Sequence, residues 1–155
     1  MTPGAISVQR EDFDPGREAD ALIAGRRDVG AVATFVGLVR DANEGCGVDA
    51  MTLEHYPGMT EAALEEIVAD AQQRWPLQGV RVIHRYGRLE TGARIVFVAV
   101  ASAHRGAAFA ACEFIMDFLK TRAPFWKKEE TPDGGRWVDA READDDAAAR
   151  WQKKA

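Results

Sequence analysis

A chain of 155 residues has the length of one domain and can bury a hydrophobic core without disulfides or metals. Its 46% hydrophobic and 29% charged residues exclude disorder, collagen and coiled coil as descriptions of the whole chain. The net charge of −5 disfavours a protein that wraps nucleic acid or lies on an anionic membrane, because both are normally basic.

The sequence carries no targeting or membrane signal. Its longest apolar run, Ile95–Ala101, is far shorter than the roughly 20 residues that span a bilayer. The N-terminus has neither a basic segment nor an apolar one, so no secretory signal is visible. Cys46 and Cys112 form no CxxC motif. We therefore expect a reduced, cytoplasmic protein.

The first elements of the chain are predicted from capping and apolar patterns. A weak alternation over Ala5–Val8 indicates a short strand, and Asp14 before Pro15 is typical of a helix start. That helix is expected to end near Gly25. The apolar, β-branched run Val29–Val39 then predicts a buried strand.

A loop, a strand and a well-marked helix follow. The polar, glycine-containing segment Arg40–Gly47 predicts the loop, and Ala50–Tyr56 predicts the strand. Thr60 is a suitable capping residue for the helix, and Pro76 ends its pattern. The apolar residues of this helix recur on one face and are Leu64, Ile67, Val68, Ala71 and Trp75.

The second half of the chain predicts hairpins and one long helix. In order, we expect strands over 80–86 and 94–102 joined by a turn at 87–92, a helix over 105–121, a hairpin of strands 125–130 and 136–138, and a loose helical tail over 143–155. The short connections favour antiparallel pairing. We therefore predict one α+β domain over residues 1–155, with mixed, mostly antiparallel strands and about three helices.

Lysines are the most unevenly placed residues. The chain has five lysines and fifteen arginines, and Lys120, Lys127 and Lys128 fall within nine residues. The segment Phe118–Lys128 holds four cations and no acid. Because the pKa of lysine shifts readily on burial, a lysine here can serve as a proton carrier or a nucleophile. We expect Lys120, near the end of its helix, to be partly buried and to carry a proton.

The lysine segment also has a structural interpretation. Its cations could simply complement the C-terminal end of a helix dipole. Phe125 and Trp126 between the lysines favour the functional interpretation, because rigid aromatic side chains provide an apolar wall against which an ammonium group loses its water.

Two further segments are candidates for anion binding. Ser102–Gly106 lies where an apolar strand meets a helix N-terminus, and free backbone N–H groups with His104 and Arg105 suit a phosphate or a carboxylate. The alternative is a simple helix start with solvated side chains. Gly37–Asp41 is a strand running into a loop, where Arg40 could hold an anion or be solvated.

No metal site is expected, because His55, His84 and His104 show no metal-binding spacing. Cys112 falls on the apolar face of its helix and is assigned to the core, whereas Cys46 has no base near it in sequence. From the residues alone we expect a cationic pocket for a small anion with lysine as the reactive group. The reaction itself stays open.

Several segments resemble the large, catalytic subunit of molybdopterin synthase. Residues 52–60 read TLEHYPGMT, and the resemblance extends from about Val29 to Trp151. The other matching segments, in the family's order, are SAHR at 102–105, FIMD at 114–117, LKTRAPFWKKE at 119–129 and RWV at 136–138.

The resemblance implies an α/β-hammerhead fold and a sulfurtransferase. Enzymes of this family convert cyclic pyranopterin monophosphate (precursor Z) to molybdopterin by forming a dithiolene. Sulfur arrives as a thiocarboxylate on the C-terminal Gly-Gly of a small ubiquitin-like subunit. Two large subunits form a central dimer with a small subunit at each end. No cofactor and no metal are implied.

The resemblance also implies site residues. Lys120 and Lys127 match the catalytic pair. The positions implied in substrate binding are Leu38, Val39, Arg40, His104, Arg105, Lys120, Lys127, Lys128, Glu129 and, near the pocket, Arg141. Leu38 stands where relatives can carry lysine, so only its backbone is implied in a contact. The partner's tail is expected in a groove beside Phe125 and Trp126.

Helix arithmetic adds a prediction about this site. His104 and Lys120 are 16 residues apart on one expected helix, or about 24 Å at ~1.5 Å per residue. One pterin is too short to reach both. If both contact the same substrate, we expect them to come from different subunits of the dimer.

Two other functions remain compatible with the residues. The chain could be a non-catalytic module that binds the tail of a ubiquitin-like partner, with Phe125 and Trp126 as anchors. A weaker alternative is a metal hydrolase that uses the three histidines. Turnover by a Lys120→Ala variant separates the first alternative from an enzyme, and metal analysis tests the second.

Overall fold

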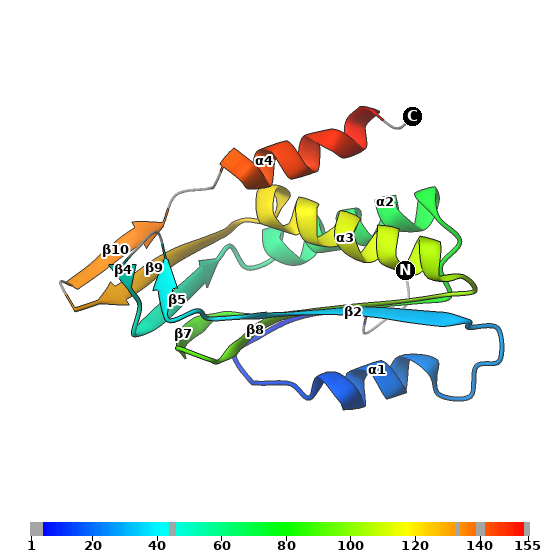
Figure 1. Ribbon diagram of the computed structural model, residues 1–155, viewed down its shortest axis with the longest axis horizontal. Coiled ribbons are helices and arrows are strands. Elements are labelled where there is room, and N and C mark those ends of the chain that lie inside the picture. The colour runs from blue at the N-terminus through cyan, green and yellow to red at the C-terminus, as the bar shows by residue number, and fades with distance from the viewer. Residues whose placement is uncertain (1–4, 44–45, 133, 139–141, 154–155) are drawn as a thin grey trace.

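The computed structural model describes residues 5–43, 46–132, 134–138 and 142–153, which form two four-stranded sheets, a small two-stranded sheet and the helices (Figure 1). The strands are β1 (Ile6–Gln9), β2 (Ala31–Leu38), β3 (Ala42–Asn43), β4 (Cys46–Gly47), β5 (Ala50–His55), β6 (Gly79–Arg85), β7 (Gly87–Glu90), β8 (Arg94–Ser102), β9 (Phe125–Thr131) and β10 (Gly134–Val138). The helices are α1 (Pro15–Ile23), α2 (Met59–Arg74), α3 (Arg105–Arg122), α4 (Glu142–Ala149) and the short 3₁₀ helix η1 (Arg150–Lys153).

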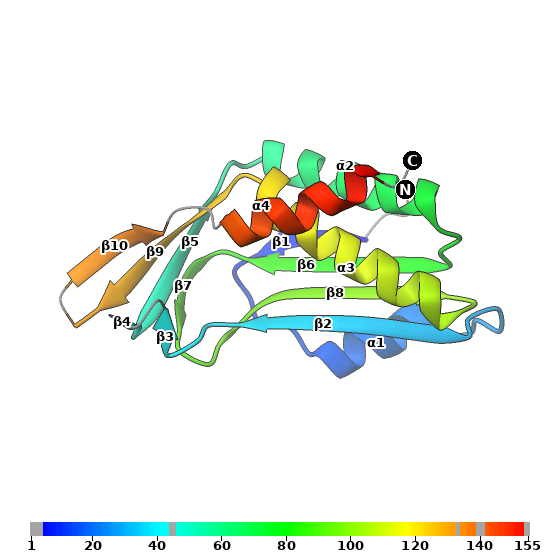
Figure 2. The same cartoon turned by 45° about the horizontal axis from the view of Figure 1, so that its top comes forward.

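The larger sheet has the order β1-β6-β8-β2, with helices on both faces. Its pairs are antiparallel except for the parallel pair of β1 and β6. Figure 2 shows α2 and α3 lying across one face, with α1 on the other. Successive side chains of β8 point to opposite faces of the sheet. Val96, Val98 and Val100 face α3, while Phe97 and Ala99 pack with Phe13 beside α1.

The smaller sheet is antiparallel throughout, with the order β10-β9-β5-β7. Figure 1 shows it at one end of the larger sheet, where α3 ends and the chain turns directly into β9. Its own core contains Val39, Val48, Leu53 and Leu89. The predicted α+β class with mostly antiparallel strands is therefore confirmed, although four helices and η1 are present in the described segments rather than about three.

The N-caps of α1 and α2 can be compared with the capping residues predicted from the sequence. Asp14 caps α1 as predicted, since its side chain accepts a hydrogen bond from the Arg17 backbone N–H. The predicted cap of α2 is wrong: the N-cap is Gly58, in the left-handed region at φ 88°, and the carboxylate of Glu61 accepts from its N–H. Thr60 is instead fully buried and bonds back to the Tyr56 backbone.

Strand β2 is an edge strand and not the buried strand that its apolar sequence predicted. Only its partner β8 pairs with it in the larger sheet. Phe35 and Leu38 are 41% and 52% exposed. An apolar run indicates side chains that are buried away from water. It does not indicate whether they are buried inside their own chain or in a contact with another chain.

Two connections that were predicted as loops contain strands. The turn expected at 87–92 includes β7, which pairs with β5 to complete the smaller sheet. The loop expected at 40–47 includes the two-residue strands β3 and β4. Strands of two to four residues carry too few side chains to show a period, which is why the sequence pattern missed them.

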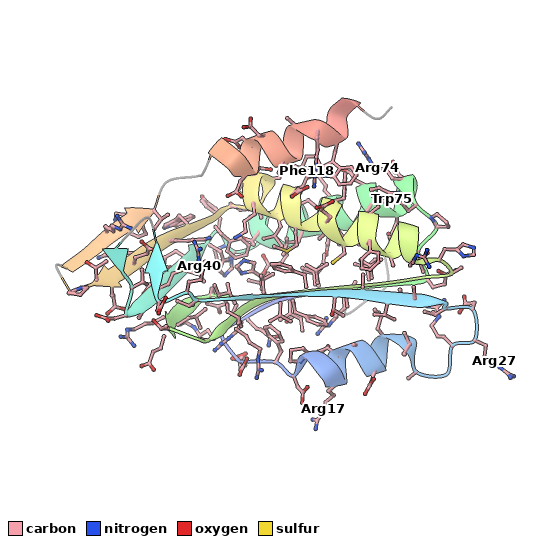
Figure 3. All side chains as sticks on the ribbon, viewed as in Figure 1. Arg17, Arg27, Arg40, Arg74, Trp75 and Phe118 are labelled. Atoms are coloured by element: carbon pink, nitrogen blue, oxygen red, sulfur yellow. The ribbon has the colours of Figure 1, made fainter. Side chains whose placement is uncertain are left out.

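The C-terminal segment is packed rather than loose. Trp151 is 6% exposed and its ring lies edge-on to Trp75 and Phe114, with centroids 5.7 and 5.5 Å away. Its indole N–H donates to Asp117 on α3 at 2.7 Å. Figure 3 shows Trp75 and Phe118 in the layer beneath α4. The alanine-rich sequence of α4 gave little sign of this contact, which depends on one tryptophan beyond it.

Candidate active site

A pocket of about 720 Å³ lies where the two sheets meet the C-terminal end of α3. It draws side chains from both sheets, α3 and α4. The lining residues are Phe35, Val36, Gly37, Leu38, Arg40, Met51, His84, Ile95, Val96, Leu119, Lys120, Ala123, Phe125, Trp126, Lys127, Glu129, Val138 and Asp144. The volume suits a small organic molecule, and the wall is apolar with a few charged groups.

The two predicted lysines meet in this pocket through different elements. Lys120 lies in the last turn of α3, and Lys127 lies on β9 immediately after the helix. Alternation along β9 puts Phe125, Lys127 and Glu129 on one face of the smaller sheet. The short Ala123-Pro124 connection thus brings two amines from a helix and a strand to the same place.

Lys127 is the titratable group best tuned for chemistry. Burial lowers its pKa to about 8, and the charge and hydrogen bond of Lys120 act in the same direction. The carboxylates of Asp144 and Glu129 oppose the shift but do not cancel it. Near neutral pH, Lys127 can therefore both hold and release a proton.

Lys120 is more exposed than predicted. We expected it to be partly buried, but in the single chain it is an exposed residue at the helix end that still reaches the pocket wall. The reason is geometric, because Leu119 takes the buried position of the last turn and the next residue points outward.

Glu129 is a buried carboxylate with a clear partner. It is 1% exposed, and Arg136 on the neighbouring strand β10 approaches it at 3.0 Å. The register opposes the two residues directly. The pairing neutralises a charge that would otherwise be costly to bury, and leaves Glu129 as a fixed element of the pocket wall.

The residues that follow β2 form another side of the pocket. Leu38 and Arg40 line it, and Figure 3 shows Arg40 on the side of β2 that faces α3. Val39 is 2% exposed and packs into the smaller sheet, while its backbone N–H and carbonyl bond to Ala93 and Gly92. Arg40 therefore lines the pocket, whereas Val39 is not among the lining residues.

A further predicted residue, Lys128, does not line the described pocket. Lys128 points to the opposite face of β9, where its ammonium lies 5.7 Å from the centre of the Trp137 ring. Arg141 falls outside the described residues. The sequence motif at 127–129 is continuous, but strand alternation separates Lys128 from its two neighbours.

His104 and Arg105 lie at the far end of α3 from the pocket. His104 is the N-cap and both side chains are exposed. The helix runs without a break from Arg105 to Arg122, a length of about 27 Å at ~1.5 Å per residue. The structure therefore keeps this pair away from Lys120 of the same chain, as the helix arithmetic predicted.

His84 is a pocket residue that sequence reasoning missed. It is 4% exposed, and its ring stacks on Phe125 at 3.7 Å between centroids and 17° between planes. Burial, together with the charges of Lys120 and Lys127, lowers its pKa to about 3. Its position in a strand with no motif offered no local signal. Asp144 was missed for the same reason.

The neutral, buried state of His84 makes the fold sensitive to acid. In the unfolded chain a histidine titrates near 6.5, so below about pH 6.5 the unfolded state binds a proton that the folded state does not. Stability therefore falls as the pH falls. We expect this group to lower the free energy of unfolding by about 2 kcal/mol between pH 8 and pH 5, measured by urea denaturation. A His84→Phe variant with the same pH slope as the parent would contradict this.

Within the described segments, no cluster of three or more His, Cys, Asp or Glu side chains is arranged to hold a metal ion. Cys112 is buried as predicted, and burial raises its pKa to about 11, so it is not a reactive thiol.

Among the described helices, none is long and apolar enough to cross a membrane.

Comparisons with known proteins agree with this geometry. The family described as MoaE protein matches residues 8–122. The molybdopterin synthase catalytic subunit of Ralstonia nicotianae is 64% identical over 146 residues, which cover 94% of this chain and 83% of that protein.

Two solved structures share the fold. The molybdopterin biosynthesis MoaE protein from Burkholderia ambifaria superposes with a TM-score of 0.82 at 57% identity, covering 96% of this chain and 98% of the other. Molybdopterin synthase from Staphylococcus aureus superposes with a TM-score of 0.79 at 30% identity, covering 86% and 96%. This chain belongs to the MoaE family, the catalytic subunits of molybdopterin synthase.

Proposed function

We propose that this protein is the sulfurtransferase that converts cyclic pyranopterin monophosphate to molybdopterin. The observation that carries the proposal is the pairing of Lys127, whose pKa is lowered to about 8, with Lys120 in a pocket of about 720 Å³. The pocket is large enough for a tricyclic pterin. Arg40 adds a fixed positive charge for the phosphate.

The two lysines suit the chemistry of dithiolene formation. Attack of a thiocarboxylate sulfur on the pterin side chain requires a polarised electrophile and the transfer of protons. The ammonium of Lys120 places positive charge beside the reacting atoms and donates a proton, and neutral Lys127 accepts one. No cysteine takes part because the sulfur comes from the partner, consistent with the inert, buried Cys112.

We infer that the sulfur donor is the C-terminal Gly-Gly thiocarboxylate of a small ubiquitin-like subunit. Phe125 and Trp126 line the pocket, and Trp126 is 42% exposed, so an extended tail can enter between an aromatic wall and the lysines. Two large subunits would form the centre of a heterotetramer that works in the cytoplasm.

The direct test mixes this chain with its thiocarboxylated small subunit and cyclic pyranopterin monophosphate. We expect the product to be a dithiolene, detected by conversion to its fluorescent oxidised derivative. A stable complex of the two chains that leaves the substrate unchanged would overturn the proposal and favour the non-catalytic binding module.

The active site is proposed to lie across the dimer of large subunits. His104 and Arg105 are exposed at the far end of α3, where a second chain can bring them to another pocket. The unpaired edge of β2, with exposed Phe35 and Leu38, and Phe109 on α3, which is 66% exposed, provide apolar surface for that contact.

A complementation experiment tests the shared site. Arg105→Ala and Lys120→Ala are each expected to inactivate a homodimer, because each removes one half of every site. In mixed dimers, one of the two sites is composed entirely of unaltered residues, so activity is expected to return to about half of the parent's per mixed dimer. Verified mixed dimers without activity would place both roles in a single chain.

A further inference from the structure

One polar side chain in the pocket has no role in the chemistry described so far. His84 lies near the end of β6 and is the only histidine among the residues that line the cavity. At 4% exposure it is more deeply buried than the lysines around it. A histidine in the core is often only structural, so its orientation decides whether it can do more.

The ring of His84 is held in one orientation. It stacks flat on Phe125, and its Nδ1 lies 2.8 Å from the carbonyl oxygen of Arg85. A carbonyl oxygen only accepts hydrogen bonds, so Nδ1 carries the proton. With the ring neutral at physiological pH, Nε2 is left with a lone pair.

Nε2 is free and open to the cavity. Within the described part of the chain it has no hydrogen-bond partner, and the only buried side-chain N or O atom without a partner there is Oε1 of Gln78. Nε2 is therefore not sealed in the core. The charged groups that line the same cavity come from four elements or their ends: Arg40 after β2, Lys120 on α3, Lys127 and Glu129 on β9, and Asp144 on α4.

The nearby charges indicate which of these groups can donate a hydrogen bond to Nε2. The charge of Lys120 is the largest of those that act on His84, followed by that of Lys127. Lys120 also lowers the pKa of Lys127, which favours the neutral amine of Lys127. An ammonium has three donors, so Lys120 has further N–H groups to place, and its exposed, flexible stem lets it reach an acceptor on the pocket wall.

We propose that His84 is a positioning residue, whose Nε2 accepts a hydrogen bond from the Lys120 ammonium in the loaded pocket and directs that ammonium toward the substrate and Lys127. A neutral acceptor suits this role. A carboxylate in the same place would stabilise the charged form of both lysines and keep Lys127 protonated. An apolar side chain would leave Lys120 free to turn into solvent.

The kinetic test uses the reconstituted complex with its thiocarboxylated partner. His84→Phe keeps an aromatic ring at this position but removes both ring nitrogens. We expect kcat to fall about 10- to 100-fold, with little change in KM or in partner binding. Of two smaller variants, His84→Gln places an amide near the position of Nε2 and is expected to retain more kcat than His84→Asn, which places it near Nδ1.

His55 is the matched control. It also lies beside Phe125, at 6.0 Å between ring centroids, but it does not line the pocket and instead contacts Thr60. We expect His55→Phe to keep near-normal kcat. Wild-type kcat in His84→Phe, or equal kcat in the Gln and Asn variants, would overturn the inference.

A second measurement does not depend on the variants of His84 folding. The ¹⁵N chemical shifts of His84 are measured in the full-length parent loaded with cyclic pyranopterin monophosphate and the small subunit without its sulfur. They are expected to show the neutral tautomer with the proton on Nδ1, and the Nε2 shift is expected to move in the same complex of Lys120→Ala. A proton on Nε2 or an unmoved shift would contradict the inference. The inference rests on the proposed function, but the two fail separately: a parent complex that makes no dithiolene overturns the function, whereas the ¹⁵N shifts decide the role of His84.

Discussion

Replacing Lys127 with alanine is expected to lower turnover by about 100- to 10,000-fold, the usual contribution of a general acid or base. The parent's kcat/KM is expected to rise with pH and to level off above about pH 8, because Lys127 must be neutral to accept a proton and its pKa is about 8. At pH 7 about a tenth of the molecules carry the neutral amine. Steady-state kinetics from pH 6 to 9.5 measure this rise in kcat/KM with pH.

The controls for Lys127 separate chemistry from partner binding. Lys127→Ala is expected to form the complex with the small subunit normally. Trp126, its neighbour on the same strand, is 42% exposed, and Trp126→Ala is expected to weaken the complex while the complex that remains still turns over. A Lys127→Ala variant that loses the complex but keeps turnover would reverse the two assignments.

Replacing Lys120 with arginine is expected to be almost as damaging as replacing it with alanine, again about 100- to 10,000-fold in kcat. Arginine keeps the positive charge but does not release its proton, and its planar fork differs in shape from an ammonium. Because Lys120 is exposed, neither substitution is expected to disturb folding, and both variants are expected to keep the melting temperature of the parent.

The same pair of variants tests the alternative of a binding module. A protein that only holds a ubiquitin-like tail would lose affinity in Lys120→Ala and have no turnover to lose. An enzyme would lose conversion while still binding its partner, as isothermal titration against the small subunit would show. An arginine variant with near-normal turnover would exclude Lys120 as a proton carrier.

The local pattern of the sequence was sufficient for the elements that carry most of the fold. The stripe of α2, the buried face of α3 and the Asp14 cap of α1 each depend on neighbours within a few turns of chain. The lysine pair was found for the same reason, since Lys120 and Lys127 are close in sequence. The family resemblance then supplied the reaction, which composition and spacing alone had left open.

Contacts between distant segments were decided only by the tertiary structure. Strand β7 became recognisable through its pairing with β5, and the expected helical tail is packed and not loose because Trp151 beyond α4 is buried. His84 and Asp144 reach the lysines from β6 and α4, elements that show no motif. Periodicity reports whether a side chain avoids water, but not which side chain it meets, because that choice depends on packing between segments far apart in the chain. The sequence by itself thus identified Lys120 and Lys127 as the amines proposed to react, and the tertiary structure determined the environment that lowers the pKa of Lys127.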